Sequence, residues 1–261
     1  LVLNAGTRLD LNNQNTTWGG LAGSGDVFSA LGNPTLNVGF NNVDTTFAGR
    51  FMRFNDVAFP LINKIGTGTL TLTSAQPASG SFGAISVSGG TLAYAGANGA
   101  AFVSTNAAQS TLNVNVGGTL LLDNASDNRN NRLGTGVGGF VNMQGGLLSF
   151  VGSSAGNTTE TVSTLAVQNG GGRIELRPDA TRQMSLNLST LSFANGTLTG
   201  ASTTNATANI IVPSTRGLVP GMSVSGPGIP AGATITAIAD ATRFVISANA
   251  TATNTAQTFA A

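Results

Sequence analysis

Short runs of alternating apolar and polar residues recur along most of the chain. They include GTLTLT at 68–73, TLNVNV at 111–116, RIELR at 173–177 and SLNLSTL at 185–191, with further runs at 85–93, 119–122, 147–151, 162–167 and 234–238. Because successive side chains of a strand point to opposite faces, such runs predict strands with one apolar face. Gly, Asn, Asp or Ser bounds each run, as turns require, so the pattern predicts an all-β chain.

The phrase Gly-Gly-Thr-Leu recurs in near copies at residues 89–92, 117–120, 145–148 and 195–198, with a looser copy at 66–70. Spacings of about 20 to 50 residues are typical of solenoids and propellers. We therefore predict a parallel β-helix (β-solenoid) whose coils stack about 4.8 Å apart. A β-sandwich or jelly roll is the alternative, since evenly spaced short strands also fit that architecture.

The composition changes near residue 203. Four prolines, Pro213, Pro220, Pro227 and Pro230, follow this point, and the repeated phrase is absent from the segment. Short strands joined by Pro-Gly turns are the simplest interpretation of this segment. We predict a solenoid domain over residues 1–202 and a small Pro/Gly-rich β module over 203–261.

Composition and charge exclude several classes of function. Only 8% of the residues are charged, with 11 basic against 10 acidic side chains, and the arginines are scattered along the chain. A phosphate-binding surface needs clustered basic residues, so nucleic acid is not an expected partner. No window of about 18 apolar residues is present, so no membrane span is expected.

The chain has no His and no Cys. Ser–His and Cys–His catalysis and thiolate or imidazole zinc sites are therefore impossible. The sole lysine, Lys64, precedes a glycine turn of the repeat, which favours a structural role over a Ser–Lys pair. Carboxylates that could hydrolyse glycosides show no convergent pair in the sequence; they are Glu160, Glu175, Asp179, Asp123 and Asp127. We expect no enzymatic activity and no cofactor.

One loop deserves a metal hypothesis. The segment DNASDNRNN at 123–131 brings Asp123, Asn124, Asp127 and Asn128 together. Oxygen-only ligands suit calcium, although EF-hand spacing is absent. The alternative is a solvated turn with side-chain-to-backbone hydrogen bonds.

Glu175 lies between Arg173 and Arg177 at a spacing of two residues. In a strand these three side chains share one face, while Ile174 and Leu176 point to the other. The pattern predicts a charge ladder on the surface.

The segments LINKIGTGTLTL at 61–72 and VSGGTL at 87–92 resemble the passenger-associated transport repeat, the autotransporter-associated β-strand repeat of large bacterial surface proteins. Similar stretches lie at 18–25, 36–39, 45–49, 118–124 and 131–134, so the resemblance covers roughly residues 1 to 200. The segment AQPASGSF at 75–82 departs from the usual turn of the family. Residues 217–230 loosely resemble short β modules of phage and surface-layer-like proteins.

The resemblance implies a right-handed β-helical passenger, exported from a bacterium and displayed outside the cell. The chain begins with Leu1 in mid-pattern, so we expect a processed product or a segment of a longer polypeptide. We expect a structural protein, a segment or subunit of a surface filament, stalk or coat. The alternatives are an adhesin passenger that binds glycans or proteins, and a phage or virus tail fibre.

Solenoids need capped ends, and uncapped strands offer edges for pairing. Neither terminal strand-like run shows a polar helical cap, so we expect copies to meet head to tail there, with a cluster of phenylalanines as a second contact. The predicted contact residues are Leu1, Val2, Leu3, Phe51, Phe54, Phe59, Phe244, Val245 and Ile246.

Overall fold

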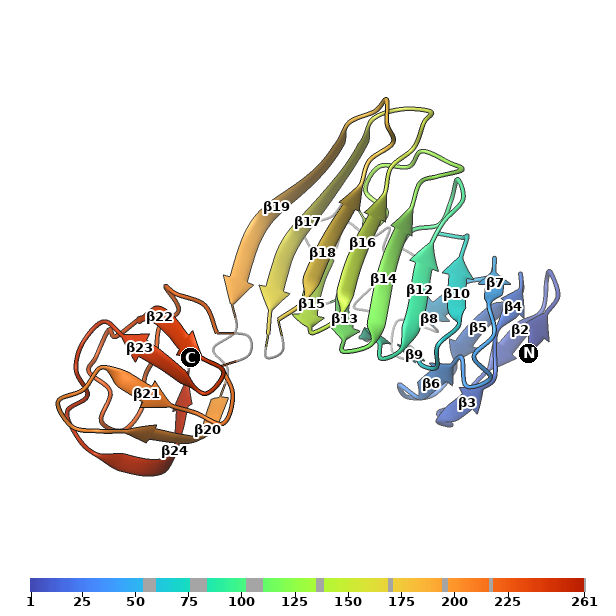
Figure 1. The fold of residues 1–261 in the computed structure, drawn as a ribbon. Coiled ribbons are helices and arrows are strands. Elements are labelled where there is room, and N and C mark those ends of the chain that lie inside the picture. The colour runs from blue at the N-terminus through green and yellow to red at the C-terminus, as the bar shows by residue number, and fades with distance from the viewer. Residues whose placement is uncertain are drawn as a thin grey trace. The chain divides into compact units, whose positions relative to one another are not determined.

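The computed structural model describes residues 1–53, 60–75, 84–101, 110–134, 139–168, 171–193, 197–215 and 218–260, which form strands and turns and no helix. These residues divide into two compact units (Figure 1). The first unit comprises Leu1–Ala166 and Gly172–Ser192, and the second comprises Val167–Gly171 and Phe193–Ala261. We call them the solenoid and the module.

The solenoid contains two eight-stranded sheets and one three-stranded sheet, and the strand pairs whose register is resolved in them are parallel (Figure 1). Sheet 1 consists, in order, of β1 (Val2–Leu3), β4 (Ala22–Gly23), β7 (Thr45–Phe47), β10 (Thr69–Leu72), β12 (Gly90–Tyr94), β14 (Gly118–Asp123), β16 (Leu147–Val151) and β18 (Arg173–Arg177). Sheet 2 consists of β3 (Thr16–Trp18), β6 (Thr35–Val38), β9 (Leu61–Lys64), β11 (Ile85–Val87), β13 (Ser110–Asn115), β15 (Gly139–Gln144), β17 (Thr158–Val167) and β19 (Met184–Phe193). Sheet 3 consists of β2 (Arg8–Asp10), β5 (Asp26–Ser29) and β8 (Phe51–Arg53).

The chain visits sheets 1 and 2 in alternation, so each coil adds one strand to each of them. Stacked positions in sheet 1 are separated by 20 residues between Val2 and Ala22 and by 28 between Thr91 and Thr119. The repeated phrases lie directly on one another, because Thr91 pairs with Thr119 and Thr119 pairs with Leu147. The predicted β-solenoid is therefore confirmed, and the sandwich alternative is wrong for this unit.

The solenoid core lies between the sheets and is built from columns of equivalent residues. Leu70, Leu92, Leu120 and Leu148 stack along sheet 1, and all four are buried. Burial of such a side chain stabilises the fold by about 1.5 to 3 kcal/mol. The alternation in the sequence thus becomes a continuous apolar interior that each new coil extends.

Glycines at the turns let neighbouring coils approach closely. Gly66 has a φ of +70°, and a Cβ there would lie 2.0 Å from the carbonyl oxygen of Gly39 in the previous coil. Only glycine fits this position, because it needs both a left-handed backbone and space for a stacked carbonyl.

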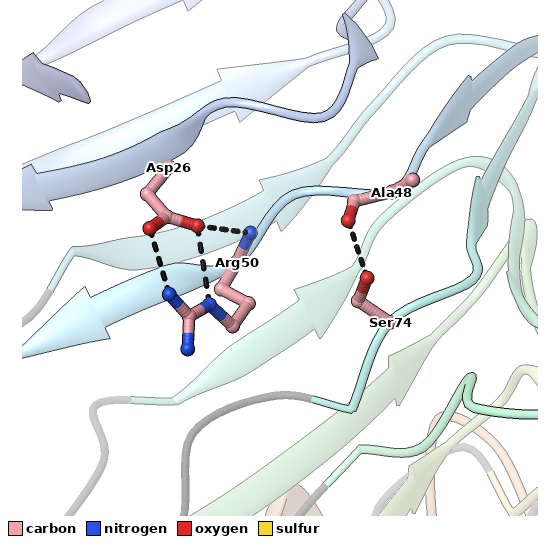
Figure 2. Close-up of polar contacts among 4 residues, drawn as sticks. All are labelled: Asp26, Ala48, Arg50 and Ser74. Carbon is pink, nitrogen blue, oxygen red and sulfur yellow. Dashed lines mark hydrogen bonds and ion pairs between the residues drawn. The ribbon is translucent and has the colours of Figure 1, made fainter. Parts of the chain in front are cut away.

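Polar side chains also tie coil to coil (Figure 2). The guanidinium of Arg50 donates from Nε and Nη2 to the two carboxylate oxygens of Asp26, at 3.2 and 2.9 Å, and the Arg50 N–H donates to the same carboxylate. The hydroxyl of Ser74 donates to the carbonyl of Ala48 (Figure 2). These contacts join positions one coil apart, so they help to fix the stacking register.

The module is a five-stranded sheet in the order β22 (Ile235–Asp240), β23 (Arg243–Ile246), β21 (Asn209–Ile211), β20 (Thr197–Thr203) and β24 (Asn254–Ala260). All its strand pairs are antiparallel. It has a hydrophobic core of its own, which includes Ile210, Phe244 and Phe259. The predicted small β module is thus present, and its sheet differs in type from those of the solenoid.

The module begins earlier than the predicted boundary at residue 202. The compact units divide at Phe193, because β20 pairs with β21 and β24 and not with a solenoid coil. Thr197 and Leu198, which end the copy of the repeated phrase at 195–198, therefore lie in a strand of the module, although the phrase matches those of the solenoid.

Candidate functional site

The last coil leaves inward-facing apolar side chains exposed at one end of the solenoid. Ile174 and Leu176 of β18 are 40% and 45% exposed, whereas Leu148 and Phe150, their partners in β16, are 0% and 1% exposed. The same two columns are therefore fully covered one coil earlier. We call the free edges of β18 and β19, with these side chains, the tail edge.

The strand β19 forms the other half of the tail edge. Its Met184 and Leu186 pack against the solenoid core, while Leu188 and Leu191 are 37% and 49% exposed. Among the described residues, β17 is the only strand that pairs with β19. The free side of β19 thus offers backbone groups and apolar side chains together.

Of the described residues that the sequence predicts as contacts between copies, some are exposed and others are buried in the core. Leu1 and Val2 are exposed, but Leu3 is buried in the core. Phe51 is also buried, with its ring centroid 5.4 Å from that of Phe47. Phe54 and Phe59 lie outside the described residues. Leu3 and Phe51 stabilise the solenoid from inside, which corrects their assignment as contacts between copies.

The predicted contact strand of the module is not an edge. β23 lies between β22 and β21, so both its sides are paired. Phe244 and Ile246 are buried in the module core, and Val245 is half-buried. Their apolar character reflects this core, and they cannot serve a second copy without unfolding.

The outer face of sheet 2 carries a column of amides and hydroxyls bonded to one another. Asn142 Nδ2 donates to Asn113 Oδ1 at 3.0 Å, and Asn113 Nδ2 donates to Ser86 Oγ at 3.3 Å. Asn63 Nδ2 donates to Asn37 Oδ1 at 2.9 Å in the same column. These groups satisfy each other, so the column is suited to holding register and less to binding a ligand.

The outer face of sheet 1 is different. Thr69, Thr91 and Thr119 stack in one column, with Thr71 beside Thr69 on the same strand. Across the described residues, the hydroxyls of these four threonines form no hydrogen bond. They remain available to water or to an external partner.

The loop predicted as a calcium candidate is organised by a buried arginine. Arg132 is fully buried, and its Nε donates to Asn124 Oδ1 at 2.8 Å. Its Nη1 donates to the carbonyls of Gly96 and Gly99, and its Nη2 donates to the carbonyl of Asp127. Burial lowers the pKa of this guanidinium, and nearby Arg129 lowers it further.

This arrangement engages the side-chain oxygens of three of the four candidate ligands, Asp123, Asn124 and Asn128. Asn124 Oδ1 also accepts the N–H of Arg129, and Asn128 Oδ1 accepts the hydroxyl of Thr158 at 3.0 Å. Asp123 Oδ1 accepts the N–H of Ala125. In the part of the chain that the structure describes, no group of three or more His, Cys, Asp or Glu side chains could hold a metal ion. A guanidinium thus supplies the positive charge of this loop.

Glu160 completes the same region from the following coil. It is buried, and its two carboxylate oxygens accept the N–H groups of Arg132 and Leu133 at 2.7 and 2.8 Å. Burial raises the pKa of Glu160 to about 7, against the opposing effect of these hydrogen bonds and of Arg132 and Arg129. The carboxylate therefore accepts backbone N–H groups of the neighbouring coil, as a strand carbonyl would.

Lys64 also lies inside the solenoid. Its ammonium donates to the carbonyl oxygens of Ile65, Gly66 and Gly89 at 2.7, 3.3 and 3.2 Å. Burial lowers the pKa of Lys64, and the charge of Asp44 opposes this shift. All three of its N–H groups are used by turn carbonyls, as the structural interpretation of this lysine requires.

The predicted charge ladder on β18 is confirmed. Glu175 accepts Arg177 Nη2 at 2.7 Å, and Arg173 Nη2 lies 3.6 Å from the same carboxylate. These groups are exposed, and exposed pairs contribute about 0 to 1 kcal/mol. The apolar side chains between them, Ile174 and Leu176, are the residues that the sequence analysis missed as a surface.

The signal for that surface was absent from the local pattern. The run RIELR alternates like every earlier coil, so nothing in it predicts that no coil follows. Exposure of Ile174 depends on β20 joining the module, which is decided by long-range pairing.

Comparison of the chain with protein-family models, with curated protein sequences and with solved structures finds no match in any of the three. Within the described part of the chain, no helix is long and apolar enough to cross a membrane. The geometry of the molecule is therefore the basis for a functional proposal.

Proposed function

We propose that this chain is an extracellular structural protein of bacterial origin, a segment or subunit of a surface filament, stalk or coat assembled through strand edges. The transport-repeat resemblance of residues 1 to about 200 supports the location and the passenger type. The tail edge carries the proposal, because it combines free backbone groups with exposed inward-facing apolar side chains. Such edges pair with other strands unless the protein protects them.

The remaining features fit a role without catalysis. Lys64, Arg132 and Glu160 are buried, and each bonds to backbone groups of stacked coils. Their placement supports stabilisation of the stacked coils, since a buried charge needs hydrogen-bond partners of this kind. The self-bonded amide column on sheet 2 adds resistance to register shift.

Analytical ultracentrifugation and electron microscopy over a range of protein concentrations test the proposal. We expect association of the wild type and monomers for the double variant Leu188→Lys/Leu191→Lys, because lysine at an edge opposes pairing. The matched control is Ile211→Lys/Ile238→Lys, which replaces two exposed apolar residues of the module. This control should associate like the wild type, and circular dichroism checks that each variant is folded.

A wild type that stays monomeric at every concentration would overturn assembly through strand edges. Equal loss of association in both double variants would also do so, because it would indicate general surface hydrophobicity instead of the tail edge.

A second candidate function is an adhesin passenger that binds glycans or proteins. The hydroxyls of Thr69, Thr71, Thr91 and Thr119 favour it, since they form an array on neighbouring strands of sheet 1 and bond to no group among the described residues. A glycan array separates the two candidates. Binding that is lost in Thr71→Val/Thr91→Val, in a protein that remains monomeric, would favour the adhesin.

A further inference from the structure

The partner of the tail edge can be specified from the shape of that edge. β19 is ten residues long, MSLNLSTLSF, and contains no charged residue and no proline. Natural edge strands usually carry lysine, proline or a bulge, or are very short. A long uncharged edge without these devices is suited to pairing with another strand.

The neighbouring strand at the same end requires an apolar partner. In sheet 1, Ile174 and Leu176 continue the buried columns of Leu148 and Phe150 but are exposed themselves. A partner must therefore offer strands to both sheets and apolar side chains between them. Another solenoid coil meets both conditions, whereas a single extended peptide meets one.

The lengths of the strands discriminate between the coils that this chain could offer. The first coil has strands of two residues in β1 and three residues in each of β2 and β3. These are too short to pair along a strand of ten residues. Among the described strands, only β17 is as long as β19, and β17 already lies between β19 and β15. A second β19 is thus the matching free edge.

We infer that the tail edge binds the tail edge of a second copy, with β19 antiparallel to β19 of the partner around a two-fold axis. This inference rests on the proposed assembly through strand edges, and it replaces the head-to-tail contact that the sequence predicts. Two-fold contacts are self-complementary, so an uncharged strand brings no like charges together. The same axis places β18 antiparallel to β18 of the second copy. In the register that sets Arg173 opposite Glu175 of the second copy, opposite charges meet.

Single-cysteine variants test the arrangement, because the natural chain has no Cys. Ser185 and Asn187 are exposed and alternate with the core-packed Met184 and Leu186, so they point outward from β19. We expect Ser185→Cys or Asn187→Cys alone to give a covalent dimer with a short bifunctional thiol reagent. Thr17→Cys, on the outer face of β3 at the opposite end of sheet 2, is the matched control and should stay monomeric.

Each other outcome has a distinct meaning. Cross-linking that needs a mixture of Asn187→Cys and Thr17→Cys would show head-to-tail stacking, which overturns the inference and leaves assembly through edges intact. Association without cross-linking at either end would overturn the inference as well. Monomers throughout, by ultracentrifugation of the uncross-linked wild type, would overturn both the inference and the proposed function.

Discussion

The module and the solenoid treat their outermost strands differently. In the module, β22 and β24 are the outer strands, and both pair with their neighbours through register shifts. β22 also ends in Asp240, which forms a 3.1 Å ion pair with Arg243. Bulges and charges of this kind oppose further pairing. In the solenoid, the outer strand β19 has no charged residue and no proline. The outer strands of the module thus oppose pairing with a further strand, whereas β19 permits it.

The interiors of the two units also differ in the polar side chains that they bury. Lys64, Arg132 and Glu160 are buried in the solenoid, whereas Thr203 and Thr215 are the buried polar side chains among the described residues of the module. Each threonine hydroxyl donates to one backbone carbonyl, at 2.7 Å. The turns of stacked coils leave carbonyls and N–H groups that need long charged side chains. A buried charge is costly to disturb, so substitutions of charged residues should lower the unfolding free energy of the solenoid more than that of the module.

The largest effect should come from Arg132. Arg132→Met removes the donor for Asn124, Gly96, Gly99 and Asp127. Each buried acceptor left unpaired costs about 1 to 3 kcal/mol, so we expect a loss of several kcal/mol in the unfolding free energy of the solenoid. The matched change in the module is Arg243→Met, which breaks an exposed pair and should cost about 1 kcal/mol or less. Urea unfolding followed by circular dichroism measures both.

If Arg132→Met shifts the unfolding of the module as much as that of the solenoid, the two units do not unfold independently. An effect no larger than that of Arg243→Met would show that the buried guanidinium is not needed for stability.

The next effect is a loss of stability of the solenoid as the pH rises through neutrality. The pKa of Glu160 is raised from 4.5 to about 7, so the folded solenoid holds this proton more tightly than the unfolded chain does. The stabilising contribution of this proton is therefore fully present below pH 4.5. It is lost as the pH rises through 7, and the loss amounts to about 3 kcal/mol. No imidazole contributes, because the chain has no His.

The slope should be absent from Glu160→Gln, as measured by urea unfolding between pH 5 and 8. The module should show the opposite sign at lower pH. Hydrogen bonds from Thr242 lower the pKa of Asp240, so its contribution is lost as the pH falls below the usual range of Asp. A slope that persists in Glu160→Gln would assign the effect to another group.

A smaller effect should come from Tyr94. Its ring is buried in the column between Leu72 and Leu122, and its hydroxyl has no hydrogen-bond partner among the described residues. Burial raises the pKa of this hydroxyl. We expect Tyr94→Phe to stabilise the solenoid by about 1 kcal/mol, because it removes an unsatisfied polar group. The reverse change in the module, Phe244→Tyr, should destabilise it. Calorimetry of both variants checks the pair, and a destabilised Tyr94→Phe would mean that the hydroxyl has a partner.

The smallest expected effect is that of calcium. The N–H of Ala125, the guanidinium of Arg132 and the hydroxyl of Thr158 engage the side-chain oxygens of Asp123, Asn124 and Asn128, respectively. Neither calcium nor EDTA should therefore change the melting temperature of either unit. A higher Tm of the solenoid in calcium, reversed by EDTA, would restore the calcium hypothesis for this loop.

Much of the fold could be predicted from the sequence. The alternation in GTLTLT and TLNVNV predicts strands, and the structure has β10 and β13 there. The copies of the repeated phrase at 89, 117 and 145 predict stacking, and they lie in register. The candidate site could not be predicted in the same way. RIELR reads like its predecessors, and the polar side chains of Lys64 and Arg132 gave no sign that they point inward.

The sequence by itself determined which residues alternate, where the chain turns and therefore which face of each strand is apolar. The tertiary structure decided which of those apolar faces become buried. Leu148 and Ile174 occupy equivalent positions, yet one is covered by the next coil and the other is not. The reason is physical: in a solenoid, burial of a side chain depends on a strand about 20 to 28 residues away, and here the chain leaves the stack after β19 to form an antiparallel sheet.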